Sequence, residues 1–365
     1  IRSGACSRRY GVKTVGGDMI QIWNHLLQEA RAVQASDLHL TTGAPPLVRL
    51  QGCLSPLTAQ AALTADMTAG LLRSFITEEQ WQQYCQLGEL DLIYAVAQKR
   101  YRIHAFQQHE GAAIAVRLIP DTLPTLAQLG HPEVLRQLAY KRRGLVIICG
   151  PTGCGKSTTL AAMVHQINCE RCCHVITLEA PIEYVHTHRS SIVNQREVPR
   201  DTPTFPQGLR AALREDPDVI LVGEMRDAET MQTVLTAAET GHLVLATLHT
   251  NEAAQALDRI IDGFPPHQQQ QVRQQLSMVL EAVVAQQLLP LLAGQGRVAA
   301  LEILLATPAV RTLIREGKTH QLVSVMQTNG KMGMQTMDMA VAVLWRQGLI
   351  ARETSNAGVK DLNLL

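Results

Sequence analysis

Short alternating runs of apolar and polar residues fill the N-terminal third of the chain. Their spacing predicts two amphipathic helices, over residues 18–33 and 65–87. Five strands are predicted with them, at 37–40, 46–50, 90–96, 100–106 and 112–118, and Gly111 takes a hairpin position. We therefore expect a small α+β domain over residues 18–118. Residues 1–17 show no such pattern and are expected to be a disordered leader.

After residue 118 the pattern changes. A proline-containing stretch, 119–143, is predicted to be a linker. Buried strands then alternate with helices, the order typical of a parallel sheet, and these strands are predicted at 145–149, 174–179, 219–222 and 243–247. The predicted fold class is thus α/β, with this core and mostly helical C-terminal segments over 144–350 and a tail at 351–365.

One long apolar stretch, 277–294, has to be assigned either to a membrane span or to the core. It contains Glu281, Gln286 and Pro290, and its apolar residues favour one helical face, so a membrane span is not expected. Val279 and Val283 continue the helical spacing of the residues before them. We interpret the stretch as a core helix.

Composition restricts the classes of partner. Basic and acidic residues number 33 and 32, giving a net charge of +1, and aromatic residues make up 4% of the chain. Neither a positive field nor a base-stacking surface is indicated, so no nucleic-acid partner is expected. Cysteines cluster only at Cys169, Cys172 and Cys173, and no second pair follows at zinc-site spacing, so no zinc is expected.

The strongest chemical signal is GPTGCGKS, which matches the phosphate-loop pattern G-x-x-x-x-G-K-[ST] and follows the apolar run LVIIC. In such a loop, backbone N–H groups and a helix N-terminus surround phosphate oxygens, Lys156 reaches the outer phosphates, and Ser157 is a ligand for Mg²⁺. A glycine corner made only for packing would not require Lys-Ser. ATP and Mg²⁺ are the expected cofactors. The predicted nucleotide-binding residues are Gly150, Pro151, Thr152, Gly153, Cys154, Gly155, Lys156, Ser157 and Thr158.

A second candidate is Glu224, which follows the predicted strand 219–222. A carboxylate there can orient and deprotonate the attacking water. Gly223 occupies the place where P-loop enzymes usually carry an aspartate, which makes direct carboxylate ligation of Mg²⁺ less secure. The alternative is that Glu224 only pairs with Arg226 on a surface turn.

Two histidines and two further carboxylates complete the candidates in this part of the chain. His242 and His249 flank the strand 243–247, and we expect an orienting role for His242 and phosphate sensing for His249. Glu179 and Glu183 lie around another strand end, where they can hold Mg²⁺ through water.

Together these stretches resemble the Walker A, Asp, Walker B and His boxes of the type II/type IV secretion ATPases. Residues 35–40, ASDLHL, resemble the signature of that family's N-terminal domain, and the resemblance covers about residues 18–350. It implies a PAS-like N-terminal domain followed by a RecA-like ATPase domain. It also implies a cytoplasmic homohexamer that binds ATP between subunits and docks on an inner-membrane pilus platform protein. Arg102 and Arg117 match the family's nucleotide-contacting arginines.

Within the family, AVRTLIRE (309–316) and GMQTMDMA (333–340) resemble the pilus retraction ATPases, and a four-cysteine insert typical of assembly ATPases is missing. The resemblance implies a motor that powers type IV pilus retraction and twitching-type motility. Two alternatives stay open: an assembly ATPase of a pilus or type II secretion system, and a regulatory subunit with little turnover, because Ala180 replaces the aspartate of the family's Glu-Asp-Pro. AVRTLIRE is also compatible with an ordinary amphipathic helix whose Arg311 and Arg315 face solvent.

Overall fold

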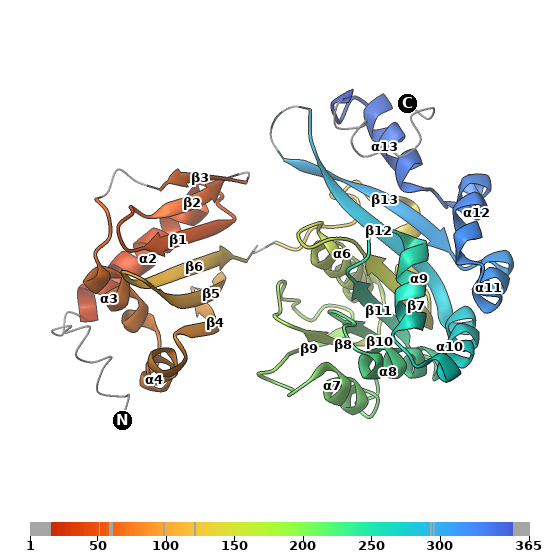
Figure 1. The fold of residues 1–365 in the computed structure, drawn as a ribbon, viewed down its shortest axis with the longest axis horizontal. Helices are drawn as coiled ribbons and strands as arrows, with labels where there is room; N and C mark the ends of the chain where they lie inside the picture. The colour runs from red at the N-terminus through yellow and green to blue at the C-terminus, as the bar shows by residue number, and fades with distance from the viewer. Residues whose placement is uncertain are drawn as a thin grey trace. The chain divides into compact units, whose positions relative to one another are not determined.

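The chain forms two compact units, Ile1–Asp121 and Thr122–Leu365 (Figure 1). A computed structural model describes residues 16–50, 52–57, 61–97, 99–119, 122–292, 294 and 296–352. Most of the expected leader (1–15) and of the expected tail (353–365) lies outside the described residues. Gly16 and Gly17, which the sequence assigns to the leader, begin the first helix.

The first unit is a six-stranded antiparallel sheet with strand order β3-β2-β1-β6-β5-β4. Its strands are β1 (Asp37–Thr41), β2 (Leu47–Leu50), β3 (Cys53–Pro56), β4 (Glu89–Val96), β5 (Lys99–Gln108) and β6 (Gly111–Leu118). Its helices are α2 (Gly16–Ala32), α3 (Ala65–Phe75) and α4 (Glu78–Leu87). Helix and strand residues share one buried cluster that includes Trp23, Leu38 and Ile114.

Two details of this unit differ from the sequence prediction. Strand β3 was not expected. The single helix predicted over 65–87 is two helices, because Thr77 begins α4 with a capping box: the Gln80 N–H donates to Thr77 Oγ1 (3.2 Å) and the Thr77 N–H donates to Gln80 Oε1 (3.0 Å). Apolar spacing runs through the break, so periodicity alone does not reveal it.

The second unit contains a seven-stranded sheet with strand order β13-β12-β7-β11-β10-β8-β9. Its strands are β7 (Gly144–Cys149), β8 (His174–Glu179), β9 (Ile192–Glu197), β10 (Val219–Val222), β11 (Leu243–Leu248), β12 (Leu280–Pro290) and β13 (Arg297–Leu305). All neighbours are parallel except β12 and β13. Its α-helices are α5 (Glu133–Ala139), α6 (Lys156–Glu170), α7 (Phe205–Ala212), α8 (Ala228–Glu239), α9 (Ala253–Asp262), α10 (Pro266–Val279), α11 (Pro308–Arg315), α12 (Leu322–Thr328) and α13 (Met337–Arg346).

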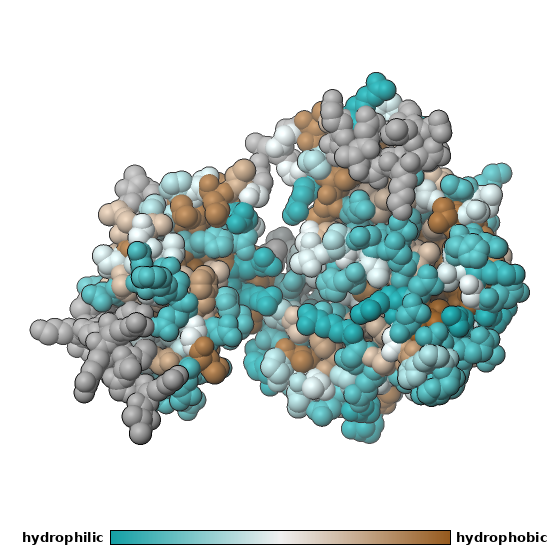
Figure 2. Space-filling view, viewed as in Figure 1, coloured by the Kyte–Doolittle hydropathy of each residue, from teal (hydrophilic) through white to brown (hydrophobic). Residues whose placement is uncertain are grey.

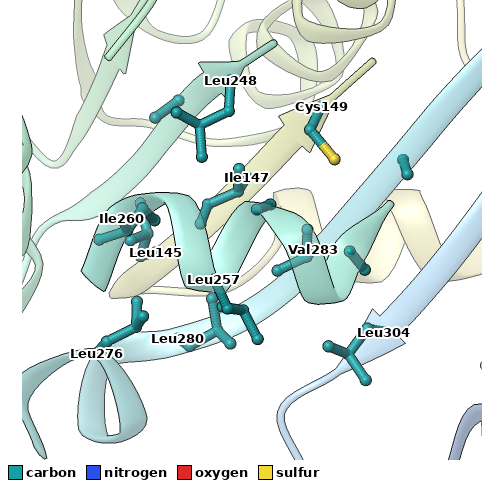
Figure 3. Close-up of a cluster of buried hydrophobic side chains, with 14 of the residues drawn as sticks. Leu145, Ile147, Cys149, Leu248, Leu257, Ile260, Leu276, Leu280, Val283 and Leu304 are labelled. Carbon is teal, nitrogen blue, oxygen red and sulfur yellow. The ribbon is translucent and has the colours of Figure 1, made fainter. Parts of the chain in front are cut away.

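Both faces of this sheet are covered. Leu145 and Ile147 of β7 pack into a cluster with α8, α9 and α10, and Figure 3 shows them beside residues of α9 and α10. Val146 and Ile148 pack on the other face with α5 and α6. Burial on both sides explains why the central strands are continuous apolar runs. The outer surface over α10, α11 and α12 is mostly hydrophilic (Figure 2), and the glutamines 268, 270, 271 and 274 of α10 are exposed.

The predicted core helix over 277–294 is wrong. Helix α10 ends at Val279, and β12 continues as a strand that pairs with β7 on one side and β13 on the other. Val283 therefore lies on a strand. A short apolar run buried on both faces has no period that separates strand from helix, which is why the sequence pattern misled.

The segment predicted as a linker also has structure of its own. Helix α5 lies within it, and Leu126, Leu135 and Leu138 are buried in the cluster beside α6. The second unit thus begins well before the phosphate loop. Across the described ranges, no helix combines the length and the apolar character that a membrane crossing requires.

Candidate functional site

The phosphate loop connects the C-terminal end of β7 to the first turn of α6. Gly155 precedes the helix with φ of 89° and offers no side-chain cap, so the first N–H groups of α6 stay directed toward the loop. Lys156 is only 8% exposed, and its ammonium donates to the carbonyl oxygens of Gly150 (2.7 Å) and Pro151 (3.0 Å). The loop therefore holds a buried positive charge beside the uncapped first turn of α6.

Cys154 is buried inside this loop. Burial raises the pKa of its thiol, which keeps the sulfur uncharged at neutral pH. This agrees with a small filler rather than a nucleophile. Among the described residues no group of His, Cys, Asp and Glu has the arrangement of a metal site, including the stretch around Cys169, Cys172 and Cys173.

Glu179 ends β8 and is held by neighbours. Its Oε1 accepts hydrogen bonds from Thr177 Oγ1 (2.6 Å) and Gln195 Nε2 (3.1 Å). Burial raises the pKa of Glu179, and the charge of Glu183 acts in the same direction. The two candidate carboxylates are thus close enough to interact. Their loop is tied to α6 because the hydroxyls of Tyr184 and Thr158 are hydrogen-bonded at 2.9 Å, a link that the sequence analysis missed.

Glu224 follows β10 and is 13% exposed. Its Oε2 lies 2.7 Å from Arg226 Nε and 3.6 Å from His249 Nε2. The ion pair with Arg226 exists, but the carboxylate also faces the histidine that follows the neighbouring strand. At Gly223 an added Cβ would lie 3.1 Å from Leu178 O and 3.3 Å from the Cα of Glu179. Crowding by β8 therefore disfavours an aspartate at that position.

Parallel strand order brings these groups to one edge of the sheet. The loop, Glu179, Glu224 and His249 all stand at the C-terminal ends of adjacent strands β7, β8, β10 and β11. His242 does not join them, because it precedes β11. Its carbonyl accepts from the N–H of Gly144 at the start of β7 (3.0 Å), six strand residues or roughly 20 Å from the loop edge.

Arg102 and Arg117 belong to the first unit, where they are direct cross-strand neighbours on β5 and β6. Both are exposed in this unit. Arg117 Nε donates to Asp37 Oδ1 (3.1 Å), and Asp37 lies opposite Arg49 on the next strand. Asp37 was not predicted as a site residue. Its place in ASDLHL now has a physical reason, since it orients one of the two arginines.

The tract AVRTLIRE forms most of α11. Val310 and Ile314 are buried, as its apolar spacing predicts. Arg311 is only partly exposed and is held by neighbours, whereas the amphipathic pattern expects it to face solvent. Its guanidinium donates to the carbonyls of Ser277 and Met278 (both 2.7 Å) and to Glu281 Oε1 (3.2 Å). Arg315 remains exposed.

Comparison with known proteins places this geometry in context. The family described as "Type II/IV secretion system protein" matches residues 15–354. The chain is 46% identical to the type IV pilus retraction ATPase PilT of Pseudomonas aeruginosa over 327 residues, 89% of this chain and 94% of that protein. It is 47% identical to a twitching motility protein of Neisseria gonorrhoeae over 311 residues, covering 85% and 83% of the two chains. A crystal structure of the pilus retraction motor PilT with bound ADP superposes with a TM-score of 0.85 at 46% identity, over 93% of this chain and 97% of that one.

Proposed function

This chain belongs to the type II/IV secretion system protein family, and from that premise we propose that it is an ATPase that powers the retraction of a type IV pilus. One observation carries the proposal: the phosphate loop, Glu224 and His249 meet at one sheet edge in a chain that resembles a retraction ATPase along almost its whole length. Twitching-type motility is the cellular result of such retraction.

ATP binds with its phosphates in the loop from Gly150 to Thr158. The N–H groups of the loop and the N-terminus of α6 stabilise the phosphate charge, and Lys156 exchanges its carbonyl partners for outer phosphate oxygens. Glu224 then accepts the proton of the attacking water. His249, 3.6 Å from that carboxylate and 48% exposed, is placed to respond to the outer phosphate.

Magnesium fits the oxygen atoms on this side of the loop. Mg²⁺ prefers hydroxyl, carboxylate and water oxygens, and Ser157, Glu179 and Glu183 provide the first two kinds. Ser157 would hold the ion through its hydroxyl, and Glu179 and Glu183 would hold it through water, with Thr177 and Gln195 already bonded to one Glu179 oxygen. When bound, the ion neutralises phosphate charge during transfer.

The active form is a homohexamer with ATP between subunits. Arg102 and Arg117, on the exposed side of their own unit, contact the nucleotide as arginine fingers, and Asp37 orients Arg117. A planar guanidinium suits this role because it remains charged and can donate to several phosphate oxygens. The hexamer works at the cytoplasmic side of the inner membrane, docked on a pilus platform protein.

Deleting the gene and counting surface pili tests the direction of the motor. A retraction ATPase predicts more pili per cell, because assembly continues without disassembly. Complementation with the intact gene, but not with a Glu224→Gln copy, should restore the normal number. A bald cell would contradict retraction and support the alternative, an assembly ATPase.

Ala180 is the observation that favours a second candidate, a regulatory subunit with little turnover. Purified hexamer should nevertheless release phosphate from ATP in a Mg²⁺-dependent way, since Glu224, His249 and the loop are in place. Ala180 is exposed, so Ala180→Asp can be introduced without repacking, and we expect it to lower the Mg²⁺ concentration needed by a few-fold at most. No release from the native chain, with release restored by Ala180→Asp, would establish the regulatory alternative.

A further inference from the structure

Three buried polar side chains form a hydrogen-bonded chain beneath the phosphate loop. Gln286 of β12, 2% exposed, donates from Nε2 to the carbonyl of Cys154 (2.7 Å). Thr159 of α6, fully buried, donates from Oγ1 to Gln286 Oε1 (2.7 Å). His131 Nε2 lies 2.9 Å from Thr159 Oγ1. The chain thus connects the segment before α5, the loop helix and β12 to one carbonyl of the loop.

The direction of these bonds is defined by chemistry. Because the Thr159 hydroxyl gives its proton to Gln286, its oxygen accepts from His131, which places the ring proton on Nε2. Burial lowers the pKa of His131 to about 4, so the ring is neutral at pH 7 and carries one proton. Each of the three bonds then has one donor and one acceptor, and the Gln286 amide is fixed with its NH₂ group toward the loop.

The backbone of β12 also touches the loop at this residue. A Cβ added at Gly150 would lie 2.4 Å from the Gln286 carbonyl oxygen, and one added at Gly155 would lie 2.8 Å from Gln286 Nε2. At Gly153 nothing lies within 4 Å. Contact with a single residue of β12 therefore excludes side chains at two of the loop's glycines, whereas Gly153 needs glycine only for its φ of 79°.

We propose that Gln286 is a positioning residue for the nucleotide, held in orientation by Thr159 and His131. In a trans peptide the C=O of one residue and the N–H of the next point in opposite directions. By holding the Cys154 carbonyl toward β12, Gln286 directs the Gly155 N–H to the opposite side, into the loop where phosphate binds. Rotation of this peptide would instead present an oxygen to the phosphates. The inference rests on the proposed nucleotide site and adds a residue distant in sequence to it.

The test uses the full-length protein, titrated with a fluorescent ADP analogue, and a thermal melt without nucleotide. Gln286→Ala leaves the Cys154 carbonyl free to rotate, and we expect ADP affinity to fall by about tenfold or more. Gln287→Ala is the matched control, because the next residue along a strand points to the other face. Thr159→Ser keeps the hydroxyl and should bind like the native chain, whereas Thr159→Val should resemble Gln286→Ala.

The outcomes separate positioning from packing. A purely structural role would lower the melting temperature and leave the ADP affinity of the folded protein unchanged, which would overturn the inference. So would equal affinities for Thr159→Ser and Thr159→Val, a pair that decides the question even where Gln286→Ala does not fold. A native chain that binds no ADP would contradict the proposed function first, and the inference would fall with it.

Discussion

In the first unit the candidate charged residues lie on the strands themselves, whereas in the second they lie at or just beyond the strand ends. Arg102, Arg117 and Asp37 occupy one cross-strand row of the antiparallel sheet. Every residue of β7, β10 and β11 is buried, and Glu224 and His249 lie just beyond the last two. A sheet with one covered face can display charge on the other, but a strand covered on both faces can hold a charge only where that charge is hydrogen-bonded, as at Glu302, or beyond the strand end.

The proposed function assigns the arginines and the phosphate loop of one nucleotide site to different subunits, and mixing variants tests this proposal. Arg117→Ala should lower ATP turnover by about 10³ to 10⁵, the range for arginine fingers. Glu224→Gln should lower it by about 10² to 10⁴ through loss of the base. If the halves come from different subunits, hexamers reassembled from both variants should recover measurable turnover.

Arg73→Ala serves as the control for the arginine, since Arg73 is an exposed residue on α3 that pairs with Glu78. It should hydrolyse ATP at the native rate. Mixed hexamers that stay as inactive as either variant would show that the groups act within one chain.

Acid should destabilise the second unit through its buried histidines. Burial lowers the pKa values of His131 and His186 to about 4, from 6.5 in the unfolded chain. The folded state therefore binds fewer protons than the unfolded state between these values. Stability is complete above pH 6.5 and is lost as the pH falls toward 4, by up to about 3 kcal/mol for each histidine. Urea unfolding at pH 7.5 and pH 5 measures this loss.

A matched variant isolates the contribution of His131 to the pH dependence of stability. His131→Gln keeps an N–H donor near Thr159 and should flatten part of the pH dependence. Glu179 acts in the opposite direction, since its raised pKa favours the folded state at lower pH, and it is unchanged in both proteins. An identical pH profile for the variant would contradict the burial argument.

The smallest expected effects are those of arginine truncation on stability, and they differ between the two units. Arg311 binds two carbonyls and a carboxylate at the junction of α10 and β12. Arg311→Ala should lower the free energy of unfolding by about 2 kcal/mol. Arg117→Ala breaks one exposed ion pair and should cost less than about 1 kcal/mol while abolishing most turnover. Thermal melts of both variants, with Arg315→Ala as the exposed control, measure the difference.

Variants of Arg311 also test whether α11 has a role in retraction that is separate from ATP hydrolysis. Arg311→Ala or Leu313→Ala should leave ATP hydrolysis measurable below the melting temperature and abolish pilus retraction in cells. Arg315→Ala should then show whether the exposed face of the helix matters by itself. Equal loss of hydrolysis and retraction would indicate that α11 is only structural.

Helices and strands whose apolar residues repeat with a clear period could be predicted from the sequence. Elements buried on both faces could be predicted only in part. The helix at α2 was located from its spacing, and the strands at β7, β10 and β11 from short apolar runs that alternate with helices. Strand β12 was mistaken for a helix because its apolar run has no polar face to mark a period of two. His242 was expected in the site because it flanks the same strand as His249, yet that strand carries the two residues to opposite ends of the sheet.

The sequence by itself determined that a phosphate loop is present, because the loop, its lysine and its helix are contiguous in GPTGCGKS and need no distant partner. It also predicted Glu224 and His249 as candidates, since each follows a recognisable strand, and their role stays a prediction. Only the tertiary structure decided what supports the loop. Gln286 lies 132 residues after Cys154 and reaches it because β12 pairs with β7. Arg311 is likewise held by carbonyls of another helix. Strand order and packing decide which distant groups share a hydrogen bond, and no local sequence pattern contains that information.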